Sequence, residues 1–221
     1  MKTNLTTILG GMACVLGLGL GAASASIVTL DSTTQNGNSP INLTVPDGNA
    51  AGITSTIHVG SLGNILNSVS LTLNISGGND GDLYAYLSYG GTSVVLLDRP
   101  GLGVGGTPGV GYTTAGYNNV TLSDGGYANI NLTAIPTTGG TYNPSAGSVA
   151  FTSYNGVNPN GNWVLFISDL NGGDNGNVSV LNSWSLTFNA VPEPVNVAMG
   201  VFAALMLAGT GFRRFRRLHR T

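Results

Sequence analysis

Polar and apolar residues alternate in short runs between positions 26 and 190. In the clearest run, 69–75, every second residue is aliphatic and the residues between are Ser, Thr or Asn. Alternation with a period of two predicts a β-strand that is buried on one face only. The same reasoning predicts further strands at 41–45, 53–59, 83–87, 94–97, 163–167 and 178–188.

The connections between these runs are typical of an all-β domain, because they are rich in Gly, Asn and Asp. Tyr89-Gly90-Gly91-Thr92 separates two of the predicted strands and indicates a hairpin. The run 163–167 is apolar on both faces, as a central strand of a sandwich would be. No helical pattern occurs between the two ends of the chain. We therefore expect residues 26–190 to form one β-sandwich or barrel, long enough for a single sizeable core.

The first 25 residues have the pattern of a secretory signal peptide. Lys2 precedes an apolar stretch at 8–22, and Ala23-Ser24-Ala25 has the small-x-small form of a cleavage site. The alternative is a buried helix of the mature protein. With Ala23 and Ala25 as the cleavage signal, the mature chain would begin at Ser26.

The C-terminal segment combines three features in a fixed order. Val191-Pro192-Glu193-Pro194 contains the only glutamate of the chain, residues 195–212 are uncharged and largely apolar, and residues 213–220 are rich in arginine. As a helix, residues 195–212 would span about 27 Å, close to the hydrocarbon thickness of a bilayer. The arginine-rich flank would stay in the cytoplasm, with the domain outside.

This order of features resembles a PEP-CTERM sorting signal. The resemblance implies a Gram-negative bacterium that makes exopolysaccharide, and a membrane exosortase that recognises Pro192-Glu193-Pro194 and removes the helix. Prolines lack a backbone donor and keep a segment extended and accessible to such an enzyme. The alternative is an ordinary single-span anchor with a proline-rich stalk.

The distribution of charge excludes some classes of function. Residues 26–190 contain eight aspartates and one basic residue, Arg99, a formal charge of −7 (8 − 1). Nucleic-acid binding depends on Lys and Arg that neutralise phosphates, so we do not expect it. Cys14, in the signal peptide, is the only cysteine, which leaves no disulfide framework or zinc site in the domain.

The strand sequences also resemble the P domain (P/Homo B domain) of proprotein convertases, over roughly residues 57–188. Matching positions include Gly81-Asp82-Leu83, Leu96-Leu97-Asp98-Arg99, Trp163, Asp169 and Ser183-Trp184. Two positions depart from the family: Gly77 or a neighbour replaces a histidine, and Tyr89 replaces a turn proline. The resemblance implies a jelly-roll sandwich like that of galactose-binding domains. It does not imply catalysis, because convertases carry their subtilisin-like catalytic site on a separate domain.

The residues themselves give little support for an enzyme. His58 is the only histidine outside the tail, and the chain has no Gly-x-Ser-x-Gly elbow. A His-Glu-x-x-His zinc site is excluded because Glu193 is the only glutamate. Asp80 and Asp82 could form a glycosidase pair, but a turn among glycines explains them more simply.

A calcium site is the better hypothesis for the acidic residues. Asp80, Asp82, Asp169 and Asp174 lie in two glycine-rich segments, 77–82 and 168–177. Ca²⁺ binds oxygen ligands from carboxylates and loop carbonyls. The P-domain resemblance implies that Asp82 and Asp169 share one end of the sandwich. The alternative is that these residues only form turns.

The sequence leaves three functions open. The first is a non-enzymatic secreted or cell-surface protein of the polysaccharide matrix, exported across the inner membrane, transiently anchored and then released by exosortase. The second is a carbohydrate-binding module that stacks tyrosines on sugar rings. Its candidate residues are Tyr84, Tyr86, Tyr89, Tyr112 and Tyr117. The third is a peptidase-associated P domain.

Overall fold

The computed structural model describes residues 25–103, 106–107, 109–133, 139–173 and 178–191, with helical positions at 200, 202, 205 and 206. All named strands lie within the unit Ala23–Pro194, and the four helical positions belong to a second unit. Among the described residues, no helix has the length and apolar character needed to span a bilayer. Most of the predicted membrane segment, 195–212, lies outside them.

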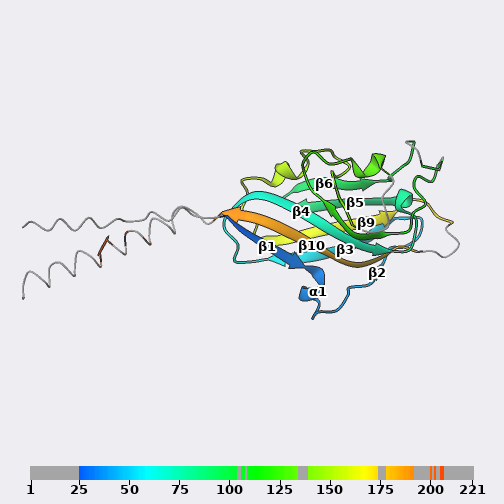
Figure 1. Ribbon diagram of the computed structural model, residues 1–221. Helices are drawn as coiled ribbons and strands as arrows, with labels where there is room; N and C mark the ends of the chain where they lie inside the picture. Colours follow the sequence, from blue (N-terminus) through cyan, green and yellow to red (C-terminus); the bar gives the residue numbers. More distant parts are fainter. Residues whose placement is uncertain are drawn as a thin grey trace, which may run out of the picture. The chain divides into compact units, whose positions relative to one another are not determined.

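Two β-sheets face each other and enclose one core (Figure 1). The six-stranded sheet runs β1-β10-β4-β7-β8, and β2 also pairs with β10. Its strands are β1 (Ser26–Asp31), β2 (Leu43–Thr44), β4 (Ile65–Ser76), β7 (Tyr117–Leu122), β8 (Thr141–Tyr142) and β10 (Val180–Val191). The four-stranded sheet runs β3-β9-β5-β6. Its strands are β3 (Asn49–Val59), β5 (Leu83–Tyr89), β6 (Thr92–Asp98) and β9 (Gly161–Asp169). The all-β prediction is confirmed.

Strand pairing is antiparallel except between β7 and β8. β5 and β6 form the predicted hairpin, which turns through Gly90 and Gly91 with φ of +57° and +82°. Glycine reaches these left-handed conformations without the steric cost that a Cβ imposes. β9 lies between β3 and β5, as expected for a run that is apolar on both faces.

Short helices interrupt the strands. The sequence pattern predicted none, but Asp31 caps one turn of helix, α1 (Ser32–Gln35), by accepting a 2.6 Å hydrogen bond from the Thr33 backbone N–H. Three 3₁₀ turns are also present: η1 (Asp80–Asp82), η2 (Ile130–Leu132) and η3 (Phe151–Tyr154). Such single turns are too short to show a helical period, so periodicity cannot reveal them.

The core forms where the inward faces of the two sheets meet. Trp163 of β9 is fully buried and contacts three rings. Tyr89 stacks on Trp163 with ring centroids 4.1 Å apart, while Tyr154 and Phe188 meet its edges at 5.0 and 5.2 Å. The indole N–H donates to the Pro159 carbonyl at 2.8 Å. This aromatic cluster therefore joins both sheets and η3.

Candidate functional site

Three of the predicted calcium ligands are buried at one end of the sandwich. Asp80 and Asp82 belong to η1 directly before β5, and Asp169 is the last residue of β9; each side chain is at most 1% exposed. The register of β5 and β9 pairs Leu83 with Asp169, which brings the two segments together. The Leu170 backbone N–H then donates to the Asp82 carbonyl at 2.9 Å. Asp174 lies outside the described residues.

Each of these carboxylates is already engaged by the chain. Asp80 Oδ2 accepts a 2.5 Å hydrogen bond from the Thr114 hydroxyl. Asp82 Oδ2 accepts from Asn79 Nδ2 at 3.1 Å, and Asp169 Oδ1 accepts from the Asn171 backbone N–H at 3.0 Å. All three carboxylates thus help to fix the loops around them.

Arg99 forms the cationic side of this cluster. Its Nη2 lies 3.8 Å from Asp82 Oδ1 and donates to the Gly109 carbonyl at 2.9 Å, while Nε donates to the Gly81 carbonyl at 3.4 Å. Among the described residues, Arg99 is the only lysine or arginine. The guanidinium therefore compensates Asp82 and links η1 to the loop at Gly109.

Asp80 has an unusual environment for a carboxylate. Its Oδ1 is buried and has no hydrogen-bond partner among the described residues. Burial raises the pKa of Asp80 to about 7, although hydrogen bonds from Thr114 and the Gly116 backbone oppose the rise. The buried Tyr117 hydroxyl likewise lacks a described partner, and burial and then the charge of Asp80 raise the pKa of Tyr117 well above its usual value. The cluster therefore favours the protonated form of Asp80.

The fit of this cluster to calcium is partial. Within the described part of the chain, no group of three or more His, Cys, Asp or Glu side chains is placed to hold a metal ion. Asp80 offers one oxygen without a described partner, whereas Asp82 already faces Arg99. A calcium ion would therefore need further oxygens, from Asp174 or from loop carbonyls.

An aromatic hollow lies on the outer face of the four-stranded sheet. Tyr84 and Tyr86 occupy alternate positions of β5, so both point outward and are half-buried. Phe166 of β9 is paired directly with Tyr86, and the two rings stack with centroids 4.8 Å apart at 18°. Tyr84 meets Tyr86 edge to face at 6.3 Å. We call these three residues the aromatic platform.

The hollow beside the platform measures about 400 Å³. It is lined by Tyr84, Tyr86, Ser88, Ser93, Val95 and Val164. Phe166, which stacks on Tyr86, is not among the residues that line the hollow. The lining of the hollow therefore combines two tyrosines, two serines and two valines, without any charge.

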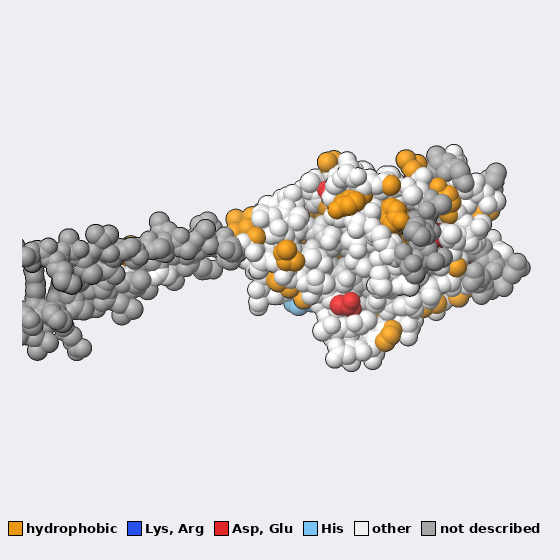
Figure 2. Space-filling view, in the orientation of Figure 1, with side chains coloured by type: hydrophobic (Ala, Val, Ile, Leu, Met, Phe, Trp, Pro, Cys, Tyr) orange, Lys and Arg blue, Asp and Glu red, His pale blue; other side chains and the backbone are white. Residues whose placement is uncertain are grey.

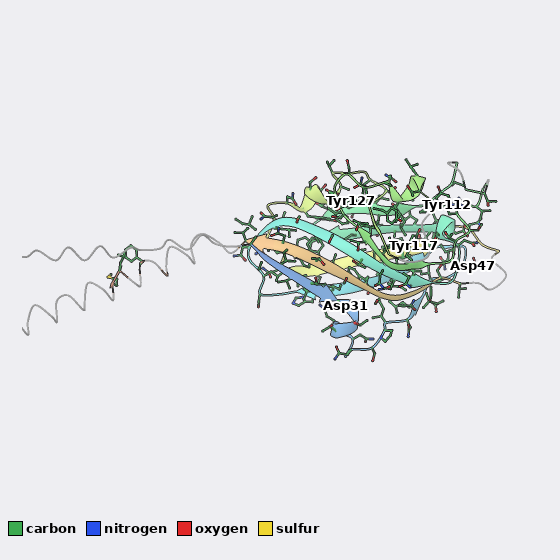
Figure 3. The ribbon with its side chains drawn as sticks, viewed as in Figure 1. Asp31, Asp47, Tyr112, Tyr117 and Tyr127 are labelled. Carbon is green, nitrogen blue, oxygen red and sulfur yellow. The ribbon has the colours of Figure 1, made fainter. Side chains whose placement is uncertain are left out.

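The other predicted sugar-binding tyrosines have structural roles. Tyr89 is stacked on Trp163 and donates to the carbonyls of Asn158 and Asn160. Tyr117 is fully buried. Tyr112 packs against Gly101, where an added Cβ would lie only 2.6 Å from its ring (Figure 3). Only Tyr84 and Tyr86 of the five predicted residues therefore line the hollow.

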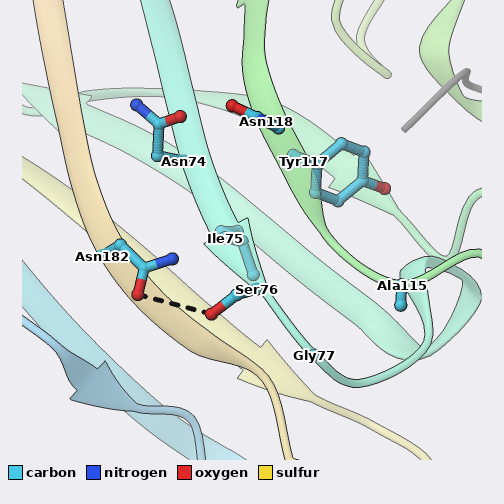
Figure 4. A pocket seen from close by; sticks show the side chains of 8 residues that line it. All are labelled: Asn74, Ile75, Ser76, Gly77, Ala115, Tyr117, Asn118 and Asn182. Carbon is cyan, nitrogen blue, oxygen red and sulfur yellow. Dashed lines mark hydrogen bonds between the residues drawn. The ribbon is translucent and has the colours of Figure 1, made fainter. Parts of the chain in front are cut away.

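A second hollow, of about 370 Å³, lies on the six-stranded sheet (Figure 4). Its polar lining consists of side chains from β4, β7 and β10: Asn74, Ser76, Asn118 and Asn182. Ser76 donates to Asn182 Oδ1 at 3.3 Å, and Asn74 Nδ2 donates to Ser183 at 3.0 Å. Much of its hydrogen-bonding capacity is thus used within the sheet, so we regard the aromatic hollow as the stronger binding candidate.

The predicted processing signals lie mostly outside the described residues. Ala23, Pro192, Glu193 and Pro194 fall there, whereas Ala25 is exposed immediately before β1. Ser26 begins β1 and pairs with Ala190. β10 extends beyond the predicted end at 188 and finishes at Val191, the first residue of the sorting motif.

His58 lies on the exposed face of β3. Its Nδ1 forms a 2.8 Å hydrogen bond with Asn162 Oδ1, and Gln35 bonds both backbone groups of His58. These bonds tie α1 and β9 to the end of β3, which gives the histidine a structural role.

The chain was compared with protein families, curated proteins and solved structures. No family model matches the chain, and no curated protein is significantly similar to it. Two similar solved structures are a complex of an Aeromonas sobria serine protease with a chaperone and the Aeromonas sobria serine protease itself. The first has a TM-score of 0.47 at 15% identity and covers 77% of this chain but 28% of that chain. The second has a TM-score of 0.41 at 15% identity, with 74% and 27% covered. This chain therefore spans little more than a quarter of either structure.

Proposed function

We propose that this chain is a non-enzymatic protein of an extracellular polysaccharide matrix, and that its sandwich binds polysaccharide through the aromatic hollow. The observation that supports this proposal best is an uncharged hollow of about 400 Å³ whose lining includes the half-buried rings of Tyr84 and Tyr86. Carbohydrate sites commonly stack an aromatic ring on the apolar face of a sugar and add a few hydrogen bonds. Ser88 and Ser93, paired across β5 and β6, supply hydroxyls for those bonds.

Export and sorting place the domain where such a ligand occurs. We propose that residues 1–25 direct export across the inner membrane of a Gram-negative bacterium. Residues 195–212 then anchor the chain until an exosortase cuts near Pro192-Glu193-Pro194, which releases the sandwich to the cell surface or the medium. The end of β10 at Val191 supports this proposal, because the cleavage motif would follow the folded sandwich directly.

The sandwich is further proposed to be a jelly roll of the P-domain type, with calcium bound at the end that holds Asp80, Asp82 and Asp169. Asp80 Oδ1, which has no hydrogen-bond partner in the described part of the chain, supports a cation there, and the ion pair between Asp82 and Arg99 opposes it. Calorimetric titration with calcium tests this part. Absence of both heat and a melting shift at high calcium would refute it without affecting the glycan proposal.

The same proposal assigns the sandwich no catalytic role. We expect the purified protein to leave unfolded casein intact and to remain unlabelled by serine-directed probes. Cleavage of casein that survives further purification would favour the peptidase-associated alternative.

A pull-down on the host's own exopolysaccharide tests the proposed function directly. The wild-type chain should be retained, and Tyr86→Ala should lose retention because it removes the ring that would contact the sugar. Tyr127→Ala is the matched control, since Tyr127 is 46% exposed and lies outside the hollow (Figure 3). Equal retention of both variants would exclude the hollow as the binding site.

A further inference from the structure

We propose that the aromatic hollow selects uncharged pyranose chains, and that Asp98 is the residue that disfavours acidic ones. This inference rests on the glycan-binding function proposed above and specifies its ligand class. Two observations support it: Asp98 lies beside the platform, and Arg99, the only described lysine or arginine, is bound to other groups.

The register of β5 and β6 places Asp98 next to the hollow. It is the last residue of β6 and pairs directly with Tyr84 of β5. Directly opposed residues share one face of a sheet, with Cβ atoms about 4.5–5.5 Å apart. Tyr84 lines the hollow and Asp98 is exposed, so a carboxylate borders the site where a ligand would lie.

No described basic side chain offsets this carboxylate. Arg99 follows Asp98 in sequence, but its backbone has a φ of +48° and its guanidinium bonds to the Gly81 and Gly109 carbonyls near Asp82. A uronic acid bound at the platform would therefore meet a negative charge and find no positive charge held ready for it. An acidic ligand loses affinity for both reasons.

The lining suits a neutral sugar. The half-buried rings of Tyr84 and Tyr86 offer surface that can pack on the C–H groups of a pyranose ring, and Val95 and Val164 add apolar surface. Ser88 and Ser93 are paired and each offers a donor and two acceptor sites, which matches sugar hydroxyls. Val95 and Val164 gain nothing from a carboxylate at C6, and none of the lining side chains carries a positive charge that would pair with one.

The test uses matched oligosaccharides of equal length that differ only at C6, where one carries a hydroxymethyl group and the other a carboxylate. Glucose, mannose and galactose series are each titrated against the full chain at low salt, by calorimetry in detergent. We expect at least one neutral member to bind and its uronic counterpart to bind more weakly. Repulsion in water between the Asp98 carboxylate and a sugar carboxylate about 7 Å away corresponds to about a threefold difference in affinity, and added salt should reduce this difference.

The variant Asp98→Asn tests the selectivity for neutral over acidic sugars separately from glycan binding itself. The variant should bind the neutral oligosaccharide as tightly as the wild type does. Because it lacks the carboxylate that repels the uronic acid, the ratio of the two affinities should fall by about threefold. Equal or tighter binding of the uronic member by the wild type would overturn the inference and leave the hollow as a glycan site. Failure of every neutral and acidic member would instead refute the proposed glycan binding.

Discussion

Replacement of Asp80 by asparagine should stabilise the sandwich at neutral and alkaline pH. Burial raises the pKa of Asp80 from its ordinary 3.8 to about 7, so the folded state holds a proton that the unfolded chain releases. Stability from this proton is fully present below pH 3.8 and is lost as the pH rises to about 7. The asparagine side chain would resemble the protonated carboxyl, because it can still accept from the Thr114 hydroxyl and carries no charge.

The magnitude follows from the size of the pKa change. At 1.36 kcal/mol per pH unit, a rise from 3.8 to about 7 corresponds to about 4 kcal/mol of unfolding free energy. That is a large fraction of the roughly 5–15 kcal/mol by which a domain is usually stable. The wild-type chain should therefore lose stability relative to Asp80→Asn between about pH 4 and about pH 7, and the difference should stay constant above that range.

Urea unfolding of both chains across this pH range, with a chelator present to remove calcium, measures the difference. Asp98→Asn makes the same chemical change at an exposed position and should leave the profile nearly unaltered, as is usual for surface substitutions. Parallel profiles for the wild type and Asp80→Asn would refute the reasoning. So would a wild-type chain that gains stability relative to Asp80→Asn as the pH rises.

Three other predictions address the core, the sorting signal and calcium. Trp163→Ala should lower the unfolding free energy by about 3–5 kcal/mol, measured by urea unfolding, because it removes a fully buried ring that contacts Tyr89, Tyr154 and Phe188. Glu193→Ala should leave export intact but keep the chain attached to its anchor, and mass spectrometry of the secreted protein locates the C-terminus; normal release of this variant would contradict the sorting proposal. If calcium binds at Asp80, its affinity should fall below about pH 7, where a proton competes for the carboxylate, and calorimetry at two pH values should show the loss.

Period-two patterns predicted most of the strands, because each strand is buried on one face. The run at 69–75 became the centre of β4, and in β9 burial alternates between Trp163, Leu165 and Ile167, which face the core, and Val164 and Phe166, which do not. That parity could have revealed Phe166 as part of the platform. The run is apolar at every position, however, so its sequence alone does not distinguish the inward face from the outward one.

Long-range register explains what the sequence left undecided at the two candidate sites. Alternation along β5 puts Tyr89 on the inward face with Leu83 and Leu87, but the ring that it stacks on, Trp163 of β9, is brought to it only by long-range register. The pairing of Leu83 with Asp169 likewise joins segments far apart in the chain. The P-domain resemblance anticipated that juxtaposition, whereas composition and spacing alone could not, since loop residues carry no periodic signal.

The two candidate sites differ in charge. Asp80, Asp82 and Asp169 are buried, and the described cation Arg99 lies against them, so the end of the sandwich holds much of the domain's charge. The outer face of the six-stranded sheet carries Ser, Thr and Asn instead, with hydroxyl pairs such as Thr72 and Thr121 at 3.0 Å. Few charged side chains are visible on the face of the molecule that Figure 2 shows. The aromatic hollow on the four-stranded sheet is also lined by uncharged residues, so it would bind through rings and neutral hydrogen bonds, which salt screens little. Attachment to a neutral polysaccharide would therefore persist in media of different ionic strength, as a matrix protein requires.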